Sequence, residues 1–304
     1  MTAWSDTREP LAMTHTREGW IASDDVRLRY VEWGPPNAPA IVALHGLRSF
    51  AYTWEPVALP LSRQFRVIAL DQRGRGLSDW DPLRRYVTSQ YVADLEQLVE
   101  VLGLRRFVLL GHSMGGATAL VYASHHHARL AGLVIEDMGP GASTSSAGSD
   151  RIRRELAATP SWFATWEQAE AYWQRIRPGI SLAARRARVQ HGMMADRTGG
   201  LVWRHDAEGI AHARLHASAH QQVDLWPHVA AVRCPALLVR GADSDFLSLE
   251  TAHAMSARNH CIQHREVAAA GHYVHDDNLP AFQAALHDFL SRRALPAWAL
   301  GGGR

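Results

Sequence analysis

A short stretch, Val108 to Gly116, carries a serine in the pattern G-x-S-x-G between an apolar run and residues that recur at helical spacing. The apolar run predicts a strand, and the spacing after the pattern predicts a helix. Gly111 and Gly115 leave room for a sharp, strained turn between the two, because a side chain at either position would obstruct it. Such a turn lifts the Ser113 hydroxyl clear of the sheet. The stretch therefore predicts a serine held for nucleophilic chemistry.

Short, continuous apolar runs recur along the chain and alternate with stretches of helical pattern. Runs of this kind are typical of strands buried on both faces, and the alternation favours a mostly parallel sheet with helices on both sides. We therefore predict an α/β fold. Trp20 to Ser23 and Val26 to Trp33 predict a hairpin of outer strands that turns at Asp24-Asp25. The buried runs are Ala40 to Leu44, Val67 to Leu70, Phe107 to Leu110, Leu133 to Ile135 and Ala236 to Val239.

One long segment interrupts the alternation. Residues 139–232 contain no convincing buried strand, but they contain helix-like stretches rich in Arg, Ala and Trp, and we interpret them as an inserted helical cap. The core is then formed by residues 19–138 and 233–293, with a flexible N-terminus over 1–18 and a tail over 294–304. Several tryptophans fall in the cap, where we expect most to pack against the core. Trp162 and Trp166 are the ones that we expect to line an apolar substrate pocket.

A serine nucleophile needs a general base at neutral pH, and the base needs an acid that fixes its tautomer. His272 follows a strand-like run, on a loop that can reach the serine. Upstream, the strand over Leu237 to Val239 ends in a turn that carries both Asp243 and Asp245. The chain order serine, acid, histidine is the order of one known fold.

Taken together, these motifs resemble the α/β-hydrolase family over about Gly19 to Leu290. His45-Gly46-Leu47 follows the third strand as the H-G-x motif of that family does. The resemblance implies that the backbone N–H groups of Leu47 and Met114 stabilise an oxyanion. Asp71 to Ser78 is similar to the family's D-x-R-G-x-G-x-S turn, and we expect a structural role for it.

The acid departs from the family's common spacing. Many members carry it three residues after the glycine that ends the strand, and Ser244 occupies that place here. A subgroup has R-G-x-x-S-D, which Arg240 to Asp245 matches, so the resemblance implies that Asp245 is the acid. Asp243 is an alternative. Asp137 is another, because some relatives place the acid after the preceding strand, although we expect it rather to anchor the following turn.

Other polar and aromatic side chains near these motifs are candidates for substrate contact. Arg48, His112 and Tyr273 join the two tryptophans in that group, although a solvent-facing position is the simpler expectation for Arg48. His45 is expected to pack beside the oxyanion loop. His212, His216 and His220 recur every four residues and would share a helical face, but no acid lies nearby. We therefore expect no metal and no cofactor.

Composition narrows the possible partners. The 32 Lys and Arg residues nearly balance the 30 Asp and Glu residues, for a net charge of +2, and no basic run of nucleic-acid type occurs. No segment has the length of a membrane span, and Met1 to Glu18 lacks the apolar core of a signal peptide. The chain has only two cysteines, Cys234 and Cys261, and we expect both to be free thiols in a reducing compartment. We expect a cytoplasmic monomer or homodimer that acts on a small molecule and binds neither nucleic acid nor membrane.

The reaction that we expect is hydrolysis of a carboxylic ester or lactone of a small, largely apolar substrate through an acyl-serine intermediate. The serine argues against dehalogenases and epoxide hydrolases of this fold, which carry an aspartate at that place. The alternatives are cleavage of a C–C, thioester or amide bond, including aminopeptidase-like action, by the same triad. Tyr273 weighs against C–C hydrolases, which often have Trp after the histidine. A ligand sensor with little turnover is a further alternative.

Overall fold

A central sheet of eight strands positions all the motifs described above. The computed structural model describes residues 16–216 and 222–297. The strand order is β1-β2-β4-β3-β5-β6-β10-β11, in which β1 and β2 form an antiparallel hairpin and the strands from β4 to β11 are parallel. The strands are β1 (Arg17–Ser23), β2 (Val26–Trp33), β3 (Ala40–Leu44), β4 (Arg66–Leu70), β5 (Phe107–His112), β6 (Leu130–Glu136), β10 (Ala236–Gly241) and β11 (Ile262–Val267).

The α/β prediction is confirmed, and so are the hairpin turn at Asp24-Asp25 and the buried strands. Every residue of β3, β5, β6 and β10 is buried, as expected for strands covered by helices on both faces. The N-terminal boundary differs, because β1 already begins at Arg17. Residues 1–15 and 298–304, on which most of the predicted flexible ends fall, lie outside the described residues.

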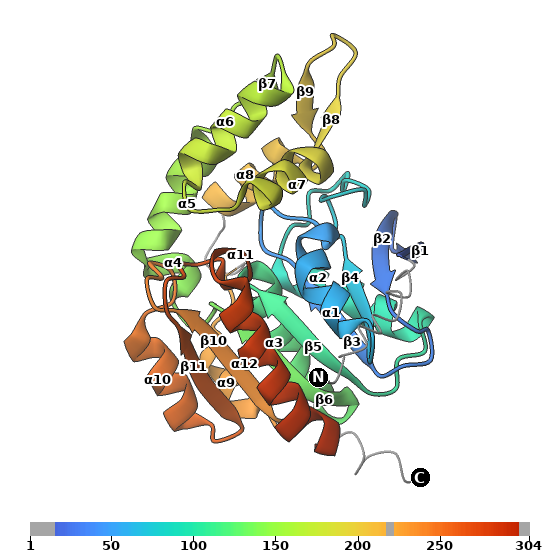
Figure 1. The fold of residues 1–304 in the computed structure, drawn as a ribbon, viewed down its shortest axis with the longest axis vertical. Coiled ribbons are helices and arrows are strands. Elements are labelled where there is room, and N and C mark those ends of the chain that lie inside the picture. The colour runs from blue at the N-terminus through green and yellow to red at the C-terminus, as the bar shows by residue number, and fades with distance from the viewer. Residues whose placement is uncertain (1–15, 217–221, 298–304) are drawn as a thin grey trace, which may run out of the picture.

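Helices cover the two faces of the sheet and enclose one apolar cluster on each side (Figure 1). Alternate residues of β3 show the division: Val42 and Leu44 belong to one cluster, and Ile41 and Ala43 to the other. The first face is covered by α2 (Thr88–Val101), α3 (Met114–His126), α9 (Trp226–Ala231) and α10 (Leu249–Arg258). The second is covered by α1 (Glu55–Leu61), α11 (Val274–Asp277) and α12 (Leu279–Phe289).

The elements from α4 to α8, within the segment predicted as a cap, lie over one end of the sheet (Figure 1), whereas α9, which the predicted range 139–232 includes, packs on the core. The cap helices are α4 (Ala142–Ser145), α5 (Ala147–Ala157), α6 (Trp166–Ile176), α7 (Leu182–Gly192) and α8 (Ala207–Leu215). The prediction of a helical cap without a convincing buried strand missed three short strands. A small antiparallel sheet, in the order β7-β9-β8, is built from β7 (Trp162–Phe163), β8 (Met193–Ala195) and β9 (Leu201–Trp203). These strands are too short for a clear alternating pattern, which explains why the sequence did not indicate them.

Buried ion pairs hold the cap to the core. Arg177, after α6, donates to Asp277 of α11 at 2.8 Å. Arg188 of α7 pairs with Asp276 of the same short helix, and both side chains are nearly inaccessible to solvent. Removing one partner of such a pair leaves a buried charge without compensation, so these contacts fix the position of the cap strongly.

The turn over Asp71 to Ser78 is fastened by charge, as expected. Arg73 is completely buried and donates to Asp81 at 2.6 Å and to both carboxylate oxygens of Asp94, at 2.6 and 2.7 Å. The Asp71 carboxylate accepts hydrogen bonds from the backbone N–H groups of Ala51 and Leu77. This turn is thereby fixed directly beside the loop that follows β3.

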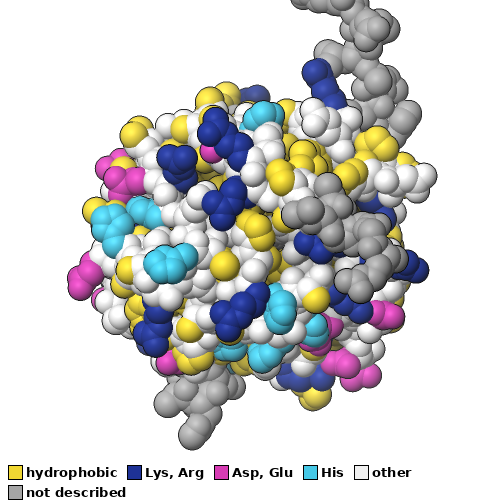
Figure 2. Space-filling model, turned by 90° about the horizontal axis from the view of Figure 1, so that it is seen from below, with side chains coloured by type: hydrophobic (Ala, Val, Ile, Leu, Met, Phe, Trp, Pro, Cys, Tyr) yellow, Lys and Arg dark blue, Asp and Glu magenta, His cyan; other side chains and the backbone are white. Residues whose placement is uncertain are grey.

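The face shown in Figure 2 carries no patch of a single charge, because basic, acidic and apolar side chains all occur on it. Among the residues described, no helix combines the length and the apolar character that crossing a bilayer requires.

Gly111 gives the first test of the fold. A Cβ at this position would lie 2.2 Å from the carbonyl oxygen of Gly115, in backbone that cannot move without opening the turn. We expect Gly111→Ala to lower the free energy of unfolding by about 1–3 kcal/mol, the usual cost of overpacking. Gly179→Ala is the matched control, because nothing lies within 4 Å of that Cβ. Urea unfolding of both variants checks this, and equal stabilities would contradict it.

Candidate active site

Ser113 occupies the turn between β5 and α3 in a strained backbone conformation. Its φ is 53° and its ψ is −117°, values that a residue with a side chain rarely adopts. The conformation is held by hydrogen bonds on both sides: the Ser113 N–H donates to the Glu136 carbonyl at 3.0 Å, and the Ser113 carbonyl accepts from Ala117 at 3.0 Å. The predicted strand, tight turn and helix are therefore present.

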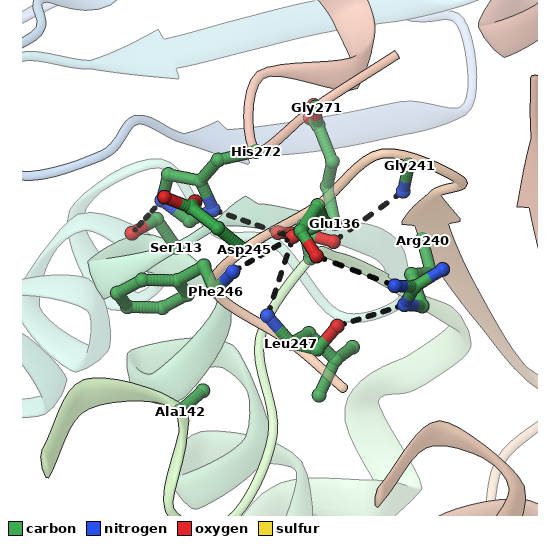
Figure 3. Close-up of polar contacts among 12 residues, drawn as sticks. Ser113, Glu136, Ala142, Arg240, Gly241, Asp245, Phe246, Leu247, Gly271 and His272 are labelled. Atoms are coloured by element: carbon green, nitrogen blue, oxygen red, sulfur yellow. Dashed lines mark hydrogen bonds and ion pairs between the residues drawn. The ribbon is translucent and has the colours of Figure 1, made fainter. Parts of the chain in front are cut away.

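His272 lies between the serine and a carboxylate. The Ser113 hydroxyl donates to Nε2 of His272 at 2.9 Å, and Nδ1–H of His272 donates to Oδ2 of Asp137 at 2.7 Å. The three residues follow β5, β11 and β6, whose carboxyl ends meet at one edge of the sheet. Figure 3 shows His272 beside Ser113, with the contacts around them as dashed lines.

The prediction that Asp245 orients the histidine is wrong in this geometry. Asp245 forms a two-point ion pair with Arg151 of α5, at 2.8 and 3.0 Å, and Asp243 is exposed. Ser244, at the position where many members of the family carry the acid, donates its hydroxyl to Oδ2 of Asp137 at 2.6 Å. The turn after β10 thus supports a carboxylate that comes from the neighbouring strand β6.

The sequence contained a signal for this arrangement. A serine at the common position of the acid, and an aspartate directly after the adjacent strand, together indicate that the carboxylate has moved from one strand end to the next. The chain at Asp137 has a φ of 48°, which turns the side chain sharply at the end of β6. Spacing along the chain does not decide between Asp137 and the acid that the R-G-x-x-S-D match indicates, Asp245.

Burial governs the electrostatics of the three groups. It lowers the pKa of His272 to about 3, with the charges of Arg151 and Arg177 acting in the same direction. Burial also raises the pKa of Asp137, against the hydrogen bonds that the carboxylate accepts from Ser244 and the Gly241 N–H. A neutral imidazole at pH 7 can accept a proton from the serine hydroxyl.

A second buried pair lies behind the first, and sequence reasoning did not find it. Glu136, the residue before Asp137, accepts hydrogen bonds from the backbone N–H of His275 at 2.9 Å and from its Nδ1 at 2.8 Å. Both side chains are almost fully buried. The pair joins the end of β6 to α11 and so fixes the backbone on both sides of the Asp137–His272 contact.

Leu47 and Met114, the predicted oxyanion residues, line the same cavity as Ser113. Met114 is the first residue of α3, where backbone N–H groups have no partner within the helix. The loop that carries Leu47 is tied to the Asp71–Ser78 turn: Gln72 donates its N–H to Nε2 of His45 at 3.1 Å and its side-chain amide to the His45 carbonyl at 2.6 Å. His45 is fully buried there, as expected.

The cavity beside Ser113 has a volume of about 140 Å³ and is walled by both the core and the cap. This volume is close to that of a cavity that holds a benzene ring, so the cavity fits a small acyl group. Its walls are mainly apolar. The apolar lining includes Met138, Ile152, Ile210, Leu225 and Phe246, and the charged lining consists of Arg75 and Arg214.

Arg48 and Tyr273 are not among the residues that line this cavity. Arg48 is buried rather than solvent-facing, and it donates to Glu155 of α5 at 2.5 Å. The Tyr273 ring stacks under the guanidinium of Arg177, 3.7 Å from its centroid. Both side chains connect the core to the cap, so their predicted contact with substrate is not supported by their positions.

The other predicted substrate contacts also lie away from the cavity. His112 is buried, and its Nε2–H donates to the His272 carbonyl at 2.8 Å, which helps to hold the loop of the base. Trp162 and Trp166 are 46% and 50% exposed and line no wall beside Ser113. The His212 and His216 rings lie 4.9 Å apart, and His220 is outside the described residues.

Comparisons with known proteins agree with this fold. A family model described as alpha/beta hydrolase fold matches residues 39–279. The chain is 32% identical to 3-hydroxybutyrate-oligomer hydrolase of Cupriavidus necator, over 81% of this chain and 87% of that protein. It is 31% identical to N-formylmaleamate deformylase of Pseudomonas putida, over 91% and 97% of the two chains. The crystal structure of E-2-(acetamidomethylene)succinate hydrolase superposes with a TM-score of 0.82 and 26% identity, covering 91% of this chain and all of that one.

The choice of acid can be tested by covalent labelling of the serine. We expect Asp137→Asn to slow the reaction of Ser113 with a fluorophosphonate by roughly two to four orders of magnitude, because the amide presents the wrong partner to Nδ1–H. Asp245→Asn is the matched control and should label within a few-fold of the unchanged protein. The reverse ranking would restore Asp245 as the acid.

Proposed function

The chain belongs to the alpha/beta hydrolase fold family, and on that premise we propose that it is a serine hydrolase that cleaves carboxylic esters through an acyl-serine intermediate. The observation that carries the proposal is the chain of hydrogen bonds from the Ser113 hydroxyl through His272 to Asp137. Such a chain activates a hydroxyl that is otherwise a weak nucleophile at neutral pH.

In the proposed reaction Ser113 attacks the carbonyl carbon while Nε2 of His272 takes the hydroxyl proton. Asp137 keeps the Nδ1–H tautomer in place and stabilises the imidazolium that forms. His272 then gives the proton to the leaving alcohol, which departs and leaves the acyl-serine. Water, activated by the same ring, attacks the acyl carbon, and the carboxylic acid is released.

The developing oxyanion requires hydrogen-bond donors that are fixed before the reaction. We assign this role to the backbone N–H groups of Leu47 and Met114. Two features support the assignment: both residues line the cavity with Ser113, and Met114 stands at the N-terminus of α3, whose dipole favours negative charge. The hydrogen bonds that Gln72 makes to His45 restrain the loop of Leu47 in advance.

The comparisons favour a second candidate, hydrolysis of a carbon–nitrogen acyl bond. One relative is named a deformylase, and the structure with a TM-score of 0.82 is that of an acetamidomethylene succinate hydrolase. The same three side chains would perform either reaction, and only the leaving group differs. Parallel assays with p-nitrophenyl acetate and p-nitroacetanilide separate the two. A burst of acylation without turnover would instead indicate a ligand sensor.

Removal of the nucleophile tests the proposal most directly. We expect Ser113→Ala to lower kcat/KM for p-nitrophenyl acetate by about three to six orders of magnitude, since triad members act as a unit. Ser124→Ala is the matched control, because Ser124 lies on the same helix α3 and bonds the Val121 carbonyl, away from the cavity. Retained turnover in a folded Ser113→Ala protein would refute the proposal.

The acid limb of the pH profile gives an independent test. Only the neutral ring of His272 accepts the serine proton, and burial lowers the pKa of that ring from 6.5 to about 3. Activity is therefore present above the lowered pKa and lost as pH falls through it, so we expect the midpoint of the acid limb of kcat/KM below pH 6.5. Tryptophan fluorescence at each pH controls for unfolding. A midpoint above 6.5 would mean that the Asp137 charge outweighs burial.

A further inference from the structure

The cavity beside Ser113 carries positive charge with no acidic side chain to balance it. Arg75 and Arg214 line it, and no Asp or Glu is found among its lining residues in the described part of the chain. A buried or half-buried cation normally has a carboxylate partner in the folded protein. Here the hydrogen-bond acceptors that the structure gives to both guanidinium groups, within the described residues, are neutral.

Arg75 belongs to the Asp71–Ser78 turn and lies in the floor of the cavity. Its Nε–H donates to the Leu47 carbonyl at 3.1 Å, and Nη1 donates to the Arg73 carbonyl and to the Tyr91 hydroxyl. The remaining nitrogen, Nη2, faces the sulfur of Met114 at 3.5 Å, a weak acceptor. One guanidinium thus touches both residues of the proposed oxyanion hole.

Three aspartates that contact neighbours of Arg75 are engaged with other side chains. Asp81 and Asp94 are bonded to Arg73, and Asp81 is shared with Arg85 as well. Asp206 accepts a hydrogen bond from the hydroxyl of Tyr86, and the guanidinium of Arg75 lies over the ring of the same tyrosine, 5.2 Å from its centroid. None of these carboxylates accepts a hydrogen bond from Arg75, so no direct ion pair neutralises the guanidinium beside the nucleophile.

Arg214, on α8 of the cap, is half-buried in the opposite wall. Its Nη2 donates to the Ser143 carbonyl and to the Ser149 hydroxyl, which hold the guanidinium in place without neutralising it. Burial and the charge of Arg153 both lower the pKa of Arg214. A bound carboxylate would act in the opposite direction, because a nearby negative charge stabilises the cation.

We infer that the substrate carries a carboxylate besides its scissile ester, and that Arg214 binds this carboxylate while Arg75 supplies a positive field at the floor of the cavity. The inference deepens the proposed function and rests on it for the position of the reacting carbonyl. A half-ester of a short dicarboxylic acid fits: its carbonyl meets Ser113, its methylene chain packs on the apolar walls, and its free carboxylate reaches the guanidinium.

This assignment changes the substrate expected from sequence, which was small and largely apolar. It also assigns the contact with substrate to Arg214 and not to Arg48, the arginine that the sequence offered as a candidate, because Arg48 is already paired with Glu155. Arg75 was read only as part of a structural turn. Arg75 has four neutral acceptors, whereas Arg73 is bound by two carboxylates. We take this difference in partners to separate a charge that is available to a ligand from a charge that stabilises the fold.

The test compares monomethyl glutarate with dimethyl glutarate, which differ by the negative charge and the methyl group that caps it. We expect kcat/KM of the wild-type protein, followed by acid release, to be about 10- to 100-fold higher for the monoester, the range of a charge-assisted hydrogen bond. Arg214→Gln should abolish this preference, so that the ratio of the two kcat/KM values falls to about 1. Arg214→Lys should keep part of it.

Arg154→Gln is the matched control, because it removes the same charge from an exposed position on α5 that does not line the cavity. Binding to the Ser113→Ala protein, measured by calorimetry, separates this inference from the proposed function. Tighter binding of the monoester that is lost in Ser113→Ala/Arg214→Gln supports the inference even if the wild-type protein hydrolyses neither ester. Equal binding of the two esters would overturn the inference, and so would a preference for the monoester that persists in the Arg214→Gln protein. In either case, hydrolysis of both esters by the wild-type protein would still support the proposed function.

Discussion

The hydrogen bond from His272 to Asp137 is the contact on which the site depends, and it exists only because parallel strands end together. β5, β6 and β11 deliver the serine, the carboxylate and the imidazole to one edge of the sheet. Between β6 and β11 lies β10, whose following turn supplies Ser244 to the same carboxylate. The acid is thus fixed by three strand ends at once, although the positive φ at Asp137 is costly by itself.

The cap supplies the second wall of the cavity beside Ser113. Its buried ion pairs to α11 set its distance from the core, and α8 thereby brings Arg214 to a cavity whose floor is Arg75. Both arginines are held by neutral groups, whereas the structural arginines in the same regions are held by carboxylates. The difference in partners, rather than the residue type, separates the charges that stabilise the fold from those that are available to a ligand.

Much of this protein could be predicted from local patterns. The elbow at Ser113, the position of His272 after a strand and the positions of the buried strands along the chain follow from steric and periodic rules that act over a few residues. The acid could not be chosen in this way, because Asp137, Asp243 and Asp245 all follow strands. The small sheet in the cap was missed because β7, β8 and β9 are too short to show a period. The prediction that Trp162 and Trp166 line the pocket failed because the size of a side chain does not indicate which face of its segment is covered.

The sequence by itself determined the fold class, the nucleophile and the candidate base, since each depends on neighbouring residues: glycines that permit a strained turn, and apolar runs that can only be buried. The tertiary structure alone decided which carboxylate faces the base and which arginines face the cavity. Those choices depend on distances between residues far apart in the chain, such as the 135 positions between Asp137 and His272, and on which charges are already neutralised in three dimensions.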